Sequence, residues 1–186
     1  TVAQLADGSA GWLGTANASA SEYGPCCNGV GRSFVGWVKM NEDASGLQIP
    51  WSPGGTVGYD LPIQIDPADG DCLIHLGGTS HNLGPAAFAD KAGEWCHVAV
   101  TADEPGDIAK LYLNGELVYT NSGMTSQWGG GSNSNPAFGL SYYASQEWEG
   151  HIGPFTIHKS VLTADEVRSA YNAGLAQVEL AGPIDS

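Results

Sequence analysis

Positively charged residues are scarce in this 186-residue chain, and their scarcity excludes two classes of partner. Six Lys and Arg stand against 20 Asp and Glu, which gives a formal net charge of −14 at pH 7. Binding nucleic acid through its phosphates needs many basic side chains that displace counterions. Anchoring on an anionic membrane surface needs basic clusters. We therefore expect no nucleic-acid partner and no electrostatic membrane anchor.

Long hydrophobic runs are absent as well. No apolar stretch approaches the roughly 20 residues that a membrane-spanning helix needs, so we expect no membrane insertion. The chain instead contains 27 Gly and 10 Pro among 42% hydrophobic residues, a combination typical of many turns between short strands. The length favours a single domain over residues 1–186, and the start at Thr1 fits a mature or trimmed chain.

Local catalytic motifs are missing too. The chain has no G-x-S-x-G nucleophile elbow, and its five His show no H-x-H or H-x-x-x-H spacing that would favour zinc. Cys96 and His97 are neighbours in an expected strand, where adjacent side chains point to opposite faces, so they cannot form a dyad. We expect no enzymatic activity. A Ser–His–Asp group or a pair of carboxylates brought together only by the fold is the catalytic alternative.

Four cysteines are present, and none belongs to a C-x-x-C motif. Cys26 and Cys27 are adjacent, and adjacent cysteines rarely bridge each other because ring closure strains the peptide between them. In an oxidising compartment each would pair with one of Cys72 and Cys96, in either of two arrangements. The alternative is four reduced, buried thiols. An acidic, Lys-poor chain with an even cysteine count favours secretion, and we expect an extracellular or cell-surface location.

Hydrophobic patterning predicts mainly β-strands. The segment Ser33–Met40 has apolar residues in both alternating sets, as in a strand buried on both faces. Asn114-Gly115 lies between two strand-like runs and predicts a hairpin, because both central residues of a type I′ turn need positive φ. Further strands are expected at Cys72–Gly78, Trp95–Ala102, 136–143 and 150–158.

One helix is predicted near the C-terminal end of the sequence. Thr163 and Glu166 have the spacing of a capping box, in which each side chain satisfies a free backbone N–H of the other residue. Gly174 is placed to end the helix. We therefore expect a short helix near 164–173 in an otherwise all-β chain.

Three segments of the chain, in this order, carry a family resemblance: SFVGWVKM, then GEWCHVAVTAD with AKLYLNGELV, then WEGHIGPFTIHKSVLTADEVRSAYNAG. They resemble an early W-V-K strand, the W-x-H-V-A-x-T strand with its L-Y-x-N-G hairpin, and the C-terminal strand and helix of laminin G-like domains, in the concanavalin A-like superfamily. The resemblance is clearest over residues 33–174. It implies a two-sheet antiparallel jelly-roll sandwich in which Trp37, Trp95 and Trp148 anchor the core. It also implies that His97 is a hydrogen-bonded core residue.

This resemblance implies a recognition or adhesion module more than an enzyme. The retaining glucanases of the superfamily carry E-x-D-x-x-E on one strand, which places carboxylates on a single face, and this chain has no such run. The commonest role of modules with this fold is binding glycans or glycoproteins. We therefore expect a non-catalytic, carbohydrate-binding module.

Sugars stack on aromatic rings, while amides and carboxylates bind their hydroxyl groups. Aromatic residues in expected loops are therefore the candidates for glycan binding, and amides beside them add hydrogen bonds. The alternative is that these indoles fold under their own loops or face a partner subunit. The predicted glycan-binding residues are Trp128, Asn133, Asn135, Trp51 and Tyr142.

Calcium is the metal that the composition favours, because hard cations bind oxygen ligands in loops. Asp66, Asp69 and Asp71 surround a Gly turn and form the expected site, although a solvated acidic turn is the alternative. Asn17 begins an N-x-S triplet, the acceptor sequence for N-glycosylation, in a polar stretch that suits an exposed segment.

The two ends of the chain suggest a second class of function. TVAQLADGSAGWLG and AQVELAGPIDS alternate weakly, so either segment is able to add a strand to its own sheet or to the edge of a neighbour's sheet. Addition to a neighbour would make the chain, with copies of itself or another subunit, part of an extracellular filament, surface layer or viral particle. A terminal strand in its own sheet is the simpler alternative.

Overall fold

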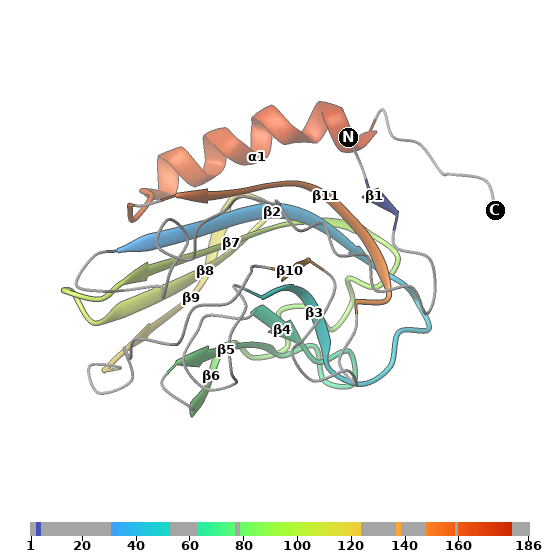
Figure 1. Cartoon of the computed structure of the whole chain (residues 1–186), viewed down its shortest axis with the longest axis horizontal. Coiled ribbons are helices and arrows are strands. Elements are labelled where there is room, and N and C mark those ends of the chain that lie inside the picture. Colours follow the sequence, from blue (N-terminus) through green and yellow to red (C-terminus); the bar gives the residue numbers. More distant parts are fainter. Residues whose placement is uncertain are drawn as a thin grey trace.

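The computed structural model describes residues 3–4, 31–52, 63–76, 79–123, 137–138, 148–158 and 160–179. Two antiparallel sheets face each other, and the helix α1 (Ala164–Glu179) covers the outside of the larger sheet (Figure 1). The larger sheet has the order β1 (Ala3–Gln4), β11 (Gly150–His158), β2 (Arg32–Met40), β7 (Trp95–Asp103), β8 (Ile108–Leu113) and β9 (Glu116–Ser122). The smaller sheet has the order β10 (Ala137–Phe138), β3 (Gln48–Ser52), β4 (Ile63–Ile65), β5 (Cys72–Leu76) and β6 (Thr79–Gly84). This architecture confirms the predicted fold class.

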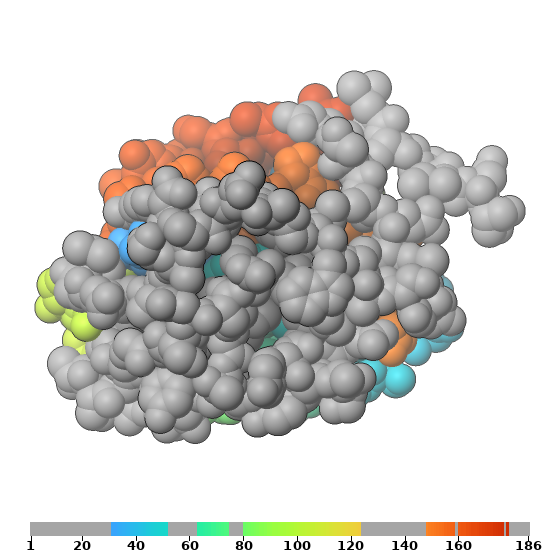
Figure 2. All heavy atoms as spheres, viewed as in Figure 1, coloured from blue at the N-terminus to red at the C-terminus, as the bar shows by residue number. Residues whose placement is uncertain are grey.

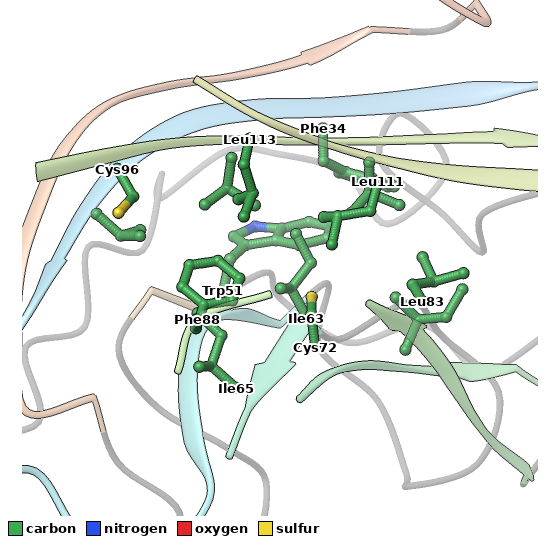
Figure 3. Close-up of a cluster of buried hydrophobic side chains, with 14 of the residues drawn as sticks. Phe34, Trp51, Ile63, Ile65, Cys72, Leu83, Phe88, Cys96, Leu111 and Leu113 are labelled. Atoms are coloured by element: carbon green, nitrogen blue, oxygen red, sulfur yellow. The ribbon is translucent and has the colours of Figure 1, made fainter. Parts of the chain in front are cut away.

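The hydrophobic core lies between the two sheets (Figure 3). Phe34 and Leu111 enter it from the larger sheet, and Trp51 and Ile63 enter it from the smaller one. All four side chains are at most 1% exposed. Removal of such apolar surface from water is the main force that holds two sheets together.

Strand β2 is buried on both faces, as its sequence predicts. Phe34 points into the core between the sheets, whereas Val35 packs against Val167 of α1 on the outer face. Trp37 also lies on the outer face, where its ring stacks on Tyr171 of the helix with 5.5 Å between ring centroids. The helix therefore creates a second, smaller apolar cluster on the outer side of the larger sheet.

The hairpin predicted at Asn114-Gly115 is confirmed. Both residues have positive φ, 49° and 81°, and they connect β8 to β9. The Asn114 side chain adds a clamp to β7, because its Oδ1 accepts a hydrogen bond from the His97 backbone N–H at 2.9 Å. The Asn114 backbone N–H donates to the His97 carbonyl at 2.8 Å. The turn thus holds the end of the β8–β9 hairpin against the neighbouring strand.

The capping box of α1 is confirmed, but the predicted end of the helix is wrong. Glu166 Oε2 accepts a hydrogen bond from the Thr163 backbone N–H at 2.8 Å, and the Glu166 N–H donates to Thr163 Oγ1 at 3.3 Å. The helix then continues past Gly174 to Glu179. Gly174 has a packing role instead, because a Cβ atom there would lie 2.2 Å from Trp37 Nε1. A glycine at this point lets the helix approach the sheet closely.

Most residues of α1 whose exposure is described are exposed to solvent, and the helix forms the upper side of the molecule in Figure 2. No helix in the described part of the chain has the length and apolar character needed to cross a membrane.

Replacement of Gly174 by alanine should destabilise the protein by about 1 to 2 kcal/mol. Alanine normally stabilises a helix interior by up to about 1 kcal/mol relative to glycine, but here the added methyl group meets the buried indole of Trp37, and overpacking costs about 1 to 3 kcal/mol. Urea unfolding measures the change. Ser169→Ala, at an exposed position of the same helix, is the control and should leave stability within about 0.5 kcal/mol. A stabilised Gly174→Ala protein would contradict the close packing.

Candidate functional site

Four of the predicted glycan-binding residues, Trp128, Asn133, Asn135 and Tyr142, lie outside the described residues, so their role stays a prediction. The structure does place the two ends of the segment that contains Trp128 and the two asparagines. This segment follows β9, at one edge of the larger sheet, and precedes β10, at one edge of the smaller sheet. Along the chain, the segment therefore leaves the larger sheet at β9 and enters the smaller sheet at β10.

Trp51 is a core residue, which corrects its prediction as an exposed stacking platform. It lies on β3, is 1% exposed, and packs its ring at 4.3 Å from Phe34 and 5.7 Å from Phe155, measured between centroids. The flanking prolines favoured a loop, because proline is rare inside central strands. The structure accommodates Pro50 by an irregular register between Gln48 and Trp51 in the pairing of β3 with β4. Pairing with β10 on one side and β4 on the other then makes β3 an interior strand.

The acidic turn at 66–71 has a structural role that its sequence did not reveal. Asp66 and Asp69 each accept a hydrogen bond from the backbone N–H two residues later, at 2.9 and 3.0 Å. Asp71 accepts from the Ala86 backbone N–H at 2.9 Å and from the Asn82 side chain, which ties the turn to the end of β6. Among the described residues no group of three or more His, Cys, Asp or Glu is arranged to hold a metal ion. Calcium binding here stays a prediction.

Cys72 and Cys96 are buried in the core, on β5 and β7 of opposite sheets, and form no disulfide within the described residues. Burial raises the pKa of Cys72 to about 12 and that of Cys96 to about 11, so neither is a reactive thiolate at neutral pH. Their proposed partners, Cys26 and Cys27, lie outside the described residues, as does the glycosylation candidate Asn17. The disulfide pairing and the glycosylation therefore stay predictions.

Of the three tryptophans predicted to anchor the core, two are buried and one is only partly buried. Trp37 and Trp148 are 3% and 4% exposed, which confirms that they are buried. Trp95 is only partly buried, which corrects its prediction as a core residue. Its register neighbour is Lys39, and the next residue, Cys96, points into the core, so the indole of Trp95 lies on the outer face of the larger sheet.

His97 lies on the same outer face under α1, and it is 1% exposed. Its ring contacts Trp37 at 5.3 Å and Tyr171 at 5.6 Å between centroids. The predicted burial is confirmed, but its Nδ1 has no hydrogen-bond partner. Loss of hydration disfavours the charged imidazolium and lowers the pKa of His97 to about 4. The residue is therefore a neutral packing element at pH 7.

Three side chains that the sequence analysis did not connect form a row on this outer face, which we call the Trp95 row: Trp95, Lys39 and His151. Lys39 lies between the other two in the register of β7, β2 and β11. The rings of Trp95 and His151 are 6.1 Å apart between centroids, at an angle of 61°. Gly153 lies on the same face, and a Cβ atom there would be in ordinary contact with Trp95 Cζ3, at 3.4 Å. An aromatic surface, an ammonium group and an imidazole thus meet at one place.

The electrostatics of the Trp95 row favour a neutral imidazole beside a positive charge. Burial and the nearby Lys39 ammonium both lower the pKa of His151 from its usual value. His151 Nδ1 is buried without a hydrogen-bond partner, and Lys39 forms no ion pair with any residue in the described ranges. The sequence alone does not reveal this row, because its three residues lie on three different strands. Predicting the row would require the order of those strands in the sheet.

Comparison with solved structures gives matches to recognition domains. The CBM40 module of the Ruminococcus gnavus IT-sialidase, bound to α2,3-sialyllactose, is 19% identical with a TM-score of 0.65, over 91% of this chain and 96% of that one. The receptor-binding domain of botulinum neurotoxin D is 15% identical with a TM-score of 0.60, over 78% and 38% of the two chains. The binding domain of Paraclostridial Mosquitocidal Protein 1 is 16% identical with a TM-score of 0.57, over 78% and 37%. At these identities the likeness shows the fold alone.

No curated protein sequence matches the chain. A family model, described as the concanavalin A-like lectin/glucanases superfamily, matches residues 14–168, which is most of the chain. This match agrees with the laminin G-like resemblance of the strand, hairpin and helix segments and with the two-sheet sandwich that those segments form. The chain therefore belongs to the concanavalin A-like lectin/glucanases superfamily.

Proposed function

We propose that this chain is a non-catalytic carbohydrate-recognition module that binds glycans or glycoproteins outside the cell. The observation that carries the proposal is the extent of the likeness to the Ruminococcus gnavus CBM40 module. The match covers 96% of that module, whose structure holds sialyllactose. The likeness thus extends over a whole sugar-binding module.

The arrangement of the chain supports the same function. The sandwich supplies a packed core whose largest members are fully buried, and binding residues are commonly carried on loops that such a rigid scaffold positions. The segment with Trp128, Asn133 and Asn135 connects the edges of the two sheets. An indole and two amides close together in the sequence offer the groups that bind the apolar face and the hydroxyl groups of a sugar.

Trp128→Ala should weaken glycan binding at least about tenfold and leave folding intact, since loss of a stacked ring removes on the order of 1.4 kcal/mol or more. Titration calorimetry with glycans that bind the wild-type protein on an array measures the effect, and circular dichroism checks the fold. Tyr119→Ala removes an aromatic side chain that is 37% exposed on β9, and it is the control. Unchanged affinity of Trp128→Ala would reject Trp128 as the platform. Absence of binding to every glycan would reject the proposed function.

One observation favours the second candidate, a structural subunit of an extracellular assembly. Among the described strands β9 is the last one at its edge of the larger sheet, and its exposed apolar side chains are Leu117, Val118 and Tyr119, at 49%, 49% and 37% exposure. Exposed edges pair readily with other chains. The opposite edge is occupied by β1, which pairs with β11 of its own sheet, so this N-terminal strand adds within the domain. A monomer by light scattering at high concentration would contradict assembly through β9.

A further inference from the structure

The Trp95 row contains a positive charge that has no ion-pair partner among the described residues of this strongly acidic protein. Among the described basic side chains, Lys91 and Arg168 form ion pairs, with Asp90 and Glu116. Lys39 is partly buried and has no acidic partner among the residues that the structure describes, although the whole sequence has 20 acidic residues. A lysine ammonium group without an acidic partner attracts an anion or another hydrogen-bond acceptor. The site is therefore complementary to a negatively charged group.

The two neighbours of Lys39 indicate what else the negatively charged ligand should contain. Trp95 is partly exposed and offers an apolar ring surface, the usual partner for the apolar face of a pyranose. The His151 side chain is partly exposed, and its ring lies 6.1 Å from that indole, measured between centroids. A neutral imidazole both donates and accepts hydrogen bonds, so it suits a sugar hydroxyl. The Lys39 ammonium suits a carboxylate.

We propose that the Trp95 row binds the carboxylate-bearing sugar of an acidic glycan, with its carboxylate at Lys39, its ring on Trp95 and a hydroxyl at His151. This inference rests on the proposed function and adds a ligand class and a site. None of its three residues is among the predicted glycan-binding residues. Sialic acids and uronic acids share the required chemistry, a pyranose that carries a carboxylate.

The structure also explains how the row is kept in place. The backbone of His151 accepts a hydrogen bond from Trp148 Nε1 at 3.3 Å, so a buried indole holds this end of β11. Gly153 cannot be replaced by a larger residue without a shift, because a Cβ atom there would lie 2.8 Å from Trp37 Cβ. The three functional groups thus lie on paired strands rather than on a loop, which favours precise placement.

Lys39→Gln should weaken binding of an acidic glycan about tenfold or more, and Lys39→Arg should retain most of it. The matched control is Lys110→Gln, since Lys110 is another partly buried lysine on the outer face of the same sheet, and its loss should change affinity less than twofold. Titration calorimetry compares α2,3-sialyllactose, a glucuronic acid disaccharide and neutral lactose. The wild-type protein should prefer one or both acidic ligands to lactose, and Lys39→Gln should lose that preference.

Each remaining outcome separates the two proposals. If Lys39→Gln binds the acidic glycan as tightly as the wild-type protein does, the Trp95 row is not the binding site, but carbohydrate recognition stands. The same conclusion follows if the wild-type protein binds lactose with the same affinity as the acidic ligands. A wild-type protein that binds neither these ligands nor any glycan on an array overturns both. Trp95→Ala is the second variant if Lys39→Gln does not fold, and it should weaken binding by a similar factor.

Discussion

Replacement of Trp51 by alanine should lower the free energy of unfolding by about 4 kcal/mol, the usual range for a large aromatic residue truncated in a core. The indole is 1% exposed and packs between Phe34 and Phe155. Removing it takes away apolar contacts with both sheets and leaves a cavity that neighbouring strands fill only in part. Because natural domains are stable by only about 5 to 15 kcal/mol, a loss of this size should be plain in urea or thermal unfolding.

Two variants make this result specific to burial. Trp51→Phe keeps an aromatic ring in the core and should lose less than half as much stability as the alanine variant. Trp95→Ala removes an indole that is only partly buried and should cost clearly less than Trp51→Ala. If Trp51→Ala folds with nearly wild-type stability but loses glycan binding, the core position of Trp51 is wrong and the original expectation of a stacking platform returns.

Acidification from pH 7 to pH 4 should destabilise the wild-type protein by up to about 3 kcal/mol more than a protein without the His97 imidazole. Burial lowers the pKa of His97 to about 4 in the folded protein, from an ordinary value of 6.5. Below pH 6.5 the unfolded chain therefore binds a proton that the folded chain does not. The stability contributed by neutral His97 is fully present above this value and is lost as the pH falls toward 4.

The measurement compares pH profiles rather than single stabilities. His97→Gln and His97→Phe do not titrate, and each is unfolded in urea at several values between pH 4 and 7. Other titrating groups affect all three proteins alike, so the difference from the wild type isolates His97. As the pH falls, the free energy of unfolding should decrease more for the wild type than for either variant. Parallel profiles would mean that His97 is able to take up a proton without disturbing its packing under α1.

Local sequence predicted the elements whose signals are contained in a few neighbouring residues. The Asn114-Gly115 turn was identifiable because its backbone conformation strongly limits the residues allowed, and the structure has both positive φ values. The Thr163–Glu166 capping box was identifiable because its hydrogen bonds join residues three apart. Strand β2 was identifiable because both alternating sets of side chains are apolar.

The candidate sites were harder to predict from the sequence, because they depend on the order of the strands. Trp51 follows a proline and precedes a Pro-Gly-Gly turn, which favoured a loop. Its strand is interior because β10 and β4 pair with it from distant parts of the chain. Lys39 and His151 are more than 100 positions apart, yet the antiparallel register of β2 and β11 makes them neighbours.

The sequence alone determined the fold class, because alternating apolar residues, tight turns and a helix cap are local choices that agree with a two-sheet sandwich. It also determined the strong negative charge. Only the tertiary structure decided which tryptophans are buried, why α1 continues past Gly174, and that Trp95, Lys39 and His151 meet. The physical reason is that alternation shows that a strand has two different faces, whereas strand pairing and helix packing decide what covers each face.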